Sequence, residues 1–113
     1  MKVCLKIICS HAAIPSIKQR IESLCMRINA VAYMEEGISK YWKCENCSVY
    51  NIQFQCHNSN IGILESELSI ISGGHRVDVH KDDFCVELSC YSAISELVSN
   101  PCSAFVNCYI TFD

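Results

Sequence analysis

Three small groups of cysteine, histidine and carboxylate residues have the types and spacing that chemistry requires. The first is Cys44-Glu-Asn-Cys47, because two thiolates at this spacing can chelate one zinc ion on a turn. Cys56 and His57 could complete a tetrahedral set, although zinc modules usually supply a second spaced pair rather than adjacent residues. Thiol redox chemistry is the other possibility, but that motif normally opens a helix, whose N-terminus lowers the thiol pKa. The sequence instead predicts a hairpin turn here.

The second group consists of Asp78, His80, Asp82 and Asp83. Asp78 and His80 fall on the same face of a predicted strand, and either aspartate of the following turn could fold back toward them. Such a group could bind a divalent cation or form an acid–base pair. The exposed polar edge of a hairpin explains the pattern equally well.

The third group is Cys9 and His11, at the end of the first predicted strand. Cysteine and histidine form nucleophilic pairs in enzymes, but the sequence offers no third group to orient this pair. It also contains no Walker loop, no GxGxxG, no GxSxG and no HExxH motif. We therefore predict a protein that is not an enzyme, and we assign no catalytic residue, cofactor or metal.

Ten cysteines in 113 residues would suit a disulfide scaffold in a secreted chain. The apolar segment from Val3 to Cys9 is too short for a signal peptide and Lys6 interrupts it, so we expect a cytoplasmic protein with mostly free thiols. Some metal ligation or structural disulfides are the alternatives. Five cysteines fall at apolar positions of predicted elements, where a free thiol acts as a small hydrophobe: Cys9, Cys25, Cys56, Cys90 and Cys108.

The elements that must position these groups follow from hydrophobic periodicity. Half of the residues are apolar and 19% are charged, which excludes disorder, and no apolar run is long enough to span a membrane. Ile14, Ile17, Ile21, Leu24 and Ile28 recur at helical spacing and predict an amphipathic helix over 15–29. The predicted strands cover Lys2–Cys9, Tyr41–Cys44, Ser48–His57, Arg76–His80, Phe84–Cys90 and Ala104–Phe112.

Three further segments complete this prediction. Residues 31–36 are ambiguous, and residues 61–72 fit a helix or a strand, of which we favour the strand. A short C-terminal helix is predicted over 92–99. The order β-α-β-β-β-β-β-α-β then indicates one α+β domain over 1–113. We expect a mostly antiparallel sheet with the long amphipathic helix packed on one face.

Charge is distributed unevenly along the chain. Residues 1–56 carry seven basic and four acidic groups, whereas residues 57–113 carry two basic and eight acidic groups. The absence of a basic patch with interleaved aromatic residues argues against nucleic-acid binding. An acidic surface would attract a basic protein, although a solvated face is the simpler explanation. The predicted contact residues are Glu65, Glu67, Asp78, Asp82, Asp83 and Glu87, and exposed aromatic anchors such as Tyr41, Trp42 or Tyr109 are the alternative.

A small chain with an acidic half, from Glu65 to Glu96, and no catalytic motif resembles the bacterial immunity proteins of contact-dependent growth inhibition systems. The resemblance implies stoichiometric binding of one cognate toxin domain, so that the toxin's active site or its access to substrate is blocked. The alternative hypothesis is a small zinc-binding or redox-sensing domain that uses Cys44, Cys47, Cys56 and His57. A small enzyme is a third.

Overall fold

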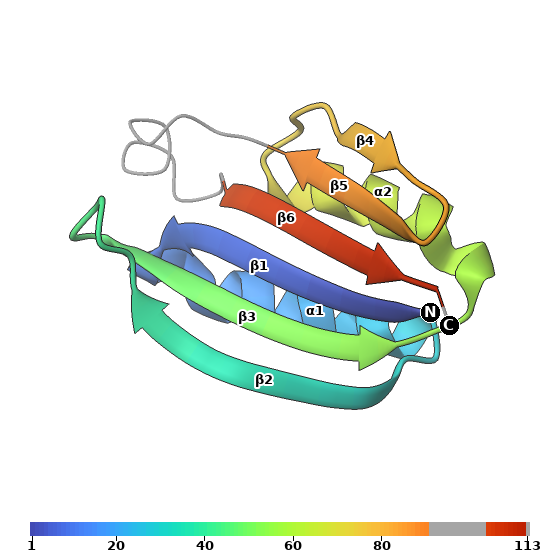
Figure 1. Ribbon diagram of the computed structural model, residues 1–113. Coiled ribbons are helices and arrows are strands. Elements are labelled where there is room, and N and C mark those ends of the chain that lie inside the picture. The colour runs from blue at the N-terminus through green and yellow to red at the C-terminus, as the bar shows by residue number, and fades with distance from the viewer. Residues whose placement is uncertain (91–103, 113) are drawn as a thin grey trace.

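A computed structural model of the chain describes residues 1–90 and 104–112 and contains one six-stranded sheet with two α-helices (Figure 1). The predicted helix over 92–99 lies outside the described residues. The elements in chain order are β1 (Lys2–Ser10), η1 (His11–Ala13), α1 (Ile14–Arg27), β2 (Val31–Lys40), β3 (Cys47–Gln55), η2 (Asn58–Asn60), α2 (Ile61–Ile71), β4 (Asp78–Lys81), β5 (Cys85–Cys90) and β6 (Ala104–Thr111). The predicted α+β class with an antiparallel sheet is confirmed.

The sheet has the strand order β2-β3-β1-β6-β5-β4, and every neighbouring pair is antiparallel. Helix α1 joins β1 to the parallel strand β2, and β3 is inserted between them as in a split β-α-β unit. Both α-helices lie on the same face of the sheet (Figure 1). Neither is long and apolar enough to cross a membrane.

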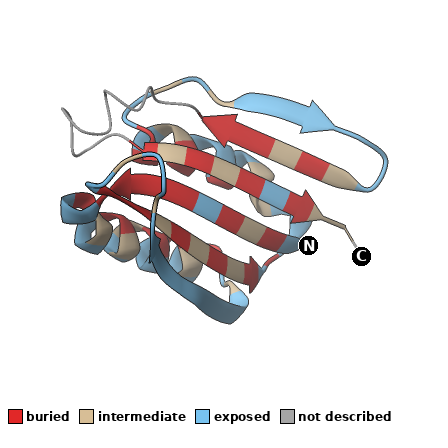
Figure 2. Ribbon diagram, turned by 60° about the vertical axis from the view of Figure 1, so that its left-hand side comes forward, coloured by how far each residue is buried: buried red, intermediate tan, exposed pale blue. Residues whose placement is uncertain are grey.

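The core lies between the sheet and the two helices, where alternate strand residues are buried (Figure 2). In β1 these residues are Val3, Leu5, Ile7 and Cys9, and the strand's other face carries exposed Lys2 and Lys6. Helix α1 contributes Ile17, Ile21 and Leu24, which are the positions that the 3-4 spacing predicts. Pro15 stands in the first helical turn, where its missing N–H breaks no hydrogen bond.

Two predicted strands are corrected by the structure. Residues 61–71 form helix α2, which buries Leu64, Leu68 and Ile71 in the core. Their helical spacing prevails over the β-branched residues because α2 covers the half of the sheet that α1 leaves open. The segment 41–44 is part of the β2–β3 connection, because Cys44 N–H donates to the Tyr41 carbonyl over 3.3 Å and turns the chain.

The ambiguous segment 31–36 opens β2, an edge strand whose ten residues are all exposed. Its pairing with β3 is interrupted at two points, the second of which lies between Glu35 and Gly37. Gly37 has a φ of 104°, which an L side chain rarely adopts, and so the residue type suits this irregularity. The irregular backbone and the charged residues make β2 a poor template for pairing with another chain.

The predicted core cysteines largely occupy the core. Cys9, Cys56, Cys90 and Cys108 are buried, and Cys25 is half-buried against the same cluster. Burial raises the pKa of the Cys9 and Cys25 thiols to about 11, so both are protonated at neutral pH. All nine cysteines in the described ranges are free.

The two charge halves of the sequence become two spatial halves of the molecule. Residues 1–56 supply β1, α1, β2 and β3, whereas the acidic remainder supplies α2, β4, β5 and β6. Because β1 pairs with β6 at the middle of the sheet, the basic and acidic halves lie side by side (Figure 1). The acidic half therefore ends at the β4 edge of the sheet.

Candidate functional site

Five carboxylates surround the β4 edge of the sheet, and we call them the acidic edge. Glu65 lies on the outer surface of α2, Asp78 in β4, Asp82 and Asp83 in the β4–β5 turn, and Glu87 in β5. The first four are exposed and Glu87 is half-buried. Five of the six predicted contact residues thus lie at or beside the β4 edge, on either face of the sheet.

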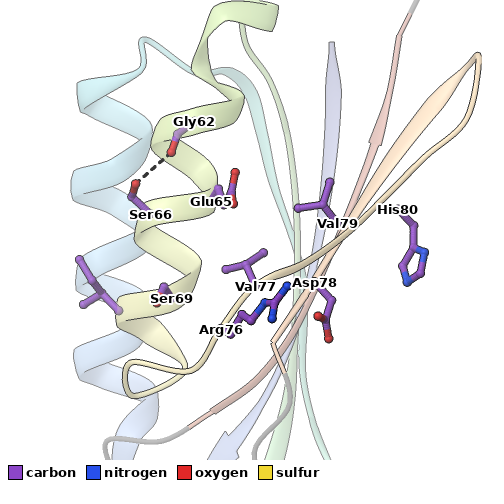
Figure 3. A pocket seen from close by; sticks show the side chains of 10 residues that line it. Gly62, Glu65, Ser66, Ser69, Arg76, Val77, Asp78, Val79 and His80 are labelled. Atoms are coloured by element: carbon purple, nitrogen blue, oxygen red, sulfur yellow. Dashed lines mark hydrogen bonds between the residues drawn. The ribbon is translucent and has the colours of Figure 1, made fainter.

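A groove of about 1080 Å³ separates α2 from the segment that leads into β4. Figure 3 shows Glu65 pointing from α2 toward β4, whereas His80 points away from the helix. Apolar Val77 and Val79 stand opposite the helix. Among the described residues, the groove is lined by Gly62, Glu65, Ser66, Ser69, Ile70, Arg76, Val77, Asp78, Val79 and His80. The groove therefore combines a small apolar wall with the carboxylate of Glu65, and Arg76 and Asp78 also line it.

Asp82 organises the turn at the end of the acidic edge. Its Oδ1 accepts the N–H groups of Phe84 and Cys85 at 2.8 and 2.9 Å, and the Cys85 thiol donates to Oδ2 over 3.0 Å. The Cys85 thiol, followed by these two N–H groups, lowers the pKa of Asp82. Asp82 is thus ionised and also committed to local structure, while Asp83 beside it is exposed.

Glu87 is held on the sheet face that points away from the helices. Asn107 Nδ2 donates to Glu87 Oε1 over 2.7 Å and to the Ser89 hydroxyl over 3.3 Å. His80 stands opposite Glu87 in the register of β4 and β5. The carboxylates of Asp78 and Glu87 consequently lie on one side of the β4 edge and that of Glu65 on the other.

The prediction that Glu67 belongs to this surface is wrong. The residue is 8% exposed, and its carboxylate pairs with Arg20 Nε at 3.4 Å and with Arg27 Nη2 at 3.3 Å, which ties α2 to α1. A strand would place Glu65 and Glu67 on one face, whereas a helix rotates them about 200° apart. The incorrect prediction of a strand over 61–72 therefore also places Glu67 incorrectly on the acidic surface.

The four-ligand zinc set of the alternative hypothesis is not assembled. Cys47 pairs with Ser10 at the end of β1, whereas the Cys56 N–H donates to the Met1 carbonyl at the strand's beginning. Because β3 separates the two pairs, Cys44 and Cys47 lie about 30 Å from Cys56 and His57. Within residues 1–90 and 104–112, no three Cys, His, Asp or Glu side chains are arranged to hold a metal ion.

Cys9 and His11 also do not form a nucleophilic pair. Cys9 is fully buried in the core beneath the helices. The His11 ring instead contacts the Ser48 hydroxyl through Nδ1 and the Glu45 carbonyl through Nε2, the latter over 3.0 Å. Its role is to fasten the start of α1 to the β2–β3 connection.

Sequence reasoning missed a polar network centred on Tyr50. This fully buried tyrosine donates its hydroxyl proton to Glu35 Oε1 over 2.5 Å. Tyr33 donates to the same oxygen over 3.2 Å, and Lys18 Nζ lies 3.4 Å from it. A buried tyrosine hydroxyl requires a partner. The register of β2 and β3 reveals this network. Glu35 stands opposite Ile52, which is on the same face of β3 as Tyr50.

The network predicts a specific dependence of stability on pH. Hydrogen bonds from Tyr50, then Tyr33 and Lys18, lower the pKa of Glu35 below its usual range. Ionised Glu35 therefore stabilises the fold above about pH 4.5, and this contribution is lost as pH falls through the lowered pKa. We expect Glu35→Gln to cost about 0.5–1.5 kcal/mol at pH 7 and less at pH 3, measured by urea unfolding.

Glu36→Gln is the matched control for this measurement. Glu36 follows Glu35 in the same exposed strand, but its carboxylate contacts the amide of Gln53 at the surface. The control should change stability little at either pH. Equal losses for the two variants at pH 7, or a loss for Glu35→Gln that grows at pH 3, would contradict the predicted role of the network.

Comparison of the chain with protein-family models, with curated proteins and with solved structures finds no match.

Proposed function

We propose that this protein binds a basic protein domain stoichiometrically through the acidic edge and performs no chemistry of its own. The observation that carries the proposal is the gathering of five carboxylates around one strand and one groove. The partner that the resemblance to immunity proteins suggests is a cognate bacterial toxin domain. Binding would then block the toxin's active site or its access to substrate.

The local charge supports recognition of a cationic surface. Arg76 and Lys81 are the basic residues of the groove lining and of β4, and they leave the acidic edge with a net charge of −3. Complementary charge increases the rate of encounter between two proteins and excludes partners of like charge. The predicted effect is greatest at low ionic strength, since salt screens exposed charges beyond about 10 Å.

The groove supports a contact that is more specific than charge alone. Val77 and Val79 provide an apolar surface that faces α2, and Glu65 of α2 points toward it. A lysine or arginine side chain has an apolar stem and a charged end, so it matches this combination. We therefore propose that a basic side chain of the partner enters between α2 and β4.

Charge reversal at the acidic edge tests the proposal. Asp78→Lys combined with Asp83→Lys is preferable to any change at Asp82, because Asp82 accepts the backbone hydrogen bonds of the turn. The partner is first captured from the native host and identified. Surface plasmon resonance then measures the rate of association over a range of salt concentrations. We expect at least about a tenfold slower association at low salt and a flatter salt dependence.

Glu22→Lys with Glu45→Lys is the control, because it makes the same change in net charge on exposed residues of the basic half. It should slow association much less. Equal effects of the two double variants would mean that only net charge matters. An unchanged rate in the first variant, or a partner that is a nucleic acid or a small molecule, would refute the proposed function.

A further inference from the structure

Two thiols are in direct contact where the β2–β3 connection enters β3. The Cys44 and Cys47 sulfurs are 3.0 Å apart, and the Cys47 N–H donates to the Cys44 carbonyl over 3.2 Å. This i to i+3 hydrogen bond defines a tight turn, whose end Cα atoms lie within about 7 Å of each other. Disulfides join Cα atoms separated by about 4.4–6.8 Å, so the turn can accept one with little movement of the backbone.

The two thiols differ in access, which gives them different roles. Cys44 is half-buried, whereas Cys47 is fully buried. Burial, reinforced by the neighbouring Cys44 thiol, raises the pKa of Cys47 above its usual range, so Cys47 stays protonated at neutral pH. A small reagent therefore reaches Cys44 first, and the Cys47 sulfur is close enough to attack the Cys44 sulfur afterwards.

We propose that Cys44 and Cys47 form a thiol–disulfide exchange site that reacts with small disulfides of the glutathione class. The Cys44 thiolate attacks one sulfur of the small disulfide, forms a mixed disulfide and releases one thiolate. Cys47 then loses its proton and attacks the Cys44 sulfur, which forms the Cys44–Cys47 bond and expels the second thiolate. Two protein thiols are oxidised, one small disulfide is reduced to two thiols, and the two cysteine protons pass to the released thiolates.

The consequence is local to the loop that carries the pair. The Tyr41 N–H donates to the Cys47 carbonyl over 3.0 Å, and the His11 N–H donates to the Asn46 carbonyl over 2.9 Å. Trp42 lies between these two hydrogen bonds and is 82% exposed. Lys43 Nζ lies 4.9 Å from the centre of the Trp42 ring. Oxidation closes the turn next to this exposed aromatic and cationic pair, so the state of the two thiols sets the freedom of a surface loop remote from the acidic edge.

Reaction of the full chain with oxidised glutathione tests the site. Intact-mass spectrometry should show the loss of two hydrogen atoms, and proteolytic mapping after alkylation should locate the bond between Cys44 and Cys47. A reduced dithiol should reverse the change. Trp42 is the chain's single tryptophan, so its fluorescence should change with oxidation and recover on reduction.

Three variants assign the two roles. Cys44→Ser, at a half-buried position, should abolish the loss of mass, and Cys47→Ser should accumulate a glutathione adduct on Cys44. Cys4→Ser, at a half-buried position on β1, should oxidise as the wild type does. Circular dichroism checks that each variant is folded. If Cys47→Ser does not fold, the comparison of Cys44→Ser with the wild type tests the proposal by itself. A disulfide at another pair, equal oxidation of Cys44→Ser, or no oxidation of the folded wild type would overturn the proposal.

Discussion

Leu24→Ala should lower the free energy of unfolding by about 2–5 kcal/mol. Leu24 is 1% exposed and projects from α1 into the core between the helix and the sheet. The substitution removes apolar contacts and leaves a cavity, because the surrounding strands can collapse only partly around it. Chemical denaturation monitored by circular dichroism measures the loss, with the slope of the transition checked for two-state behaviour.

Met26→Ala is the control for this effect. Met26 lies two residues further along the same helix but is 81% exposed, so its removal should change stability by less than about 0.5 kcal/mol. The pair of variants compares the inner and outer faces of α1 at similar side-chain size. A loss below about 1 kcal/mol for Leu24→Ala, or similar losses for both variants, would mean that α1 packs through a different face.

The sequence predicts α1 and the central strands well because a single physical signal determines them. The apolar side chains of α1 recur at 3-4 spacing, and those of β1 alternate, so each element has one face that must be covered. No competing pattern is present in either segment. The hairpin predicted across Lys81, Asp82 and Asp83 is almost as clear, since these polar residues interrupt two alternating runs. The structure pairs β4 with β5 from Asp78–Ser89 to Lys81–Val86, so the turn lies one residue later than predicted.

The prediction fails where two patterns coincide. Residues 61–71 combine helical spacing with isoleucines and serines that suit a strand, and only the position of the segment beside α1 decides between them. The consequence extends to the site, because Glu67 turns inward to Arg20 and Arg27 while Glu65 stays outside. Tertiary packing of this kind cannot be obtained from local periodicity.

The acidic edge was partly predictable for a different reason. The charge imbalance is a property of the whole second half of the sequence, and it becomes spatial because that half forms one side of the sheet. The Tyr50–Glu35 network has no comparable signal, since it needs the β2–β3 register to bring the two residues together. Charge blocks therefore predict surfaces, whereas single buried hydrogen bonds require the register.

Ser66→Pro should destabilise the protein by about 3 kcal/mol or more, because Ser66 lies in the interior of α2. Proline removes the N–H that would bond to the Gly62 carbonyl, and its ring collides with that carbonyl. The Ser66 hydroxyl, which donates to the same carbonyl over 3.1 Å, is lost as well. Since Ser66 is exposed, no core contact changes, and the loss reports on the backbone and on this one hydroxyl.

Ser66→Ala separates the backbone effect from the loss of the side chain. Alanine keeps the N–H and has the highest helix propensity, so this variant should match or slightly exceed the stability of the wild type. Thermal and urea unfolding of both variants measure the difference. If Ser66→Pro came within about 1 kcal/mol of Ser66→Ala, residues 61–71 would not be helical in solution. Glu65 and Glu67 would then share one face, as the strand hypothesis requires, and the acidic edge would have to be redrawn to include Glu67.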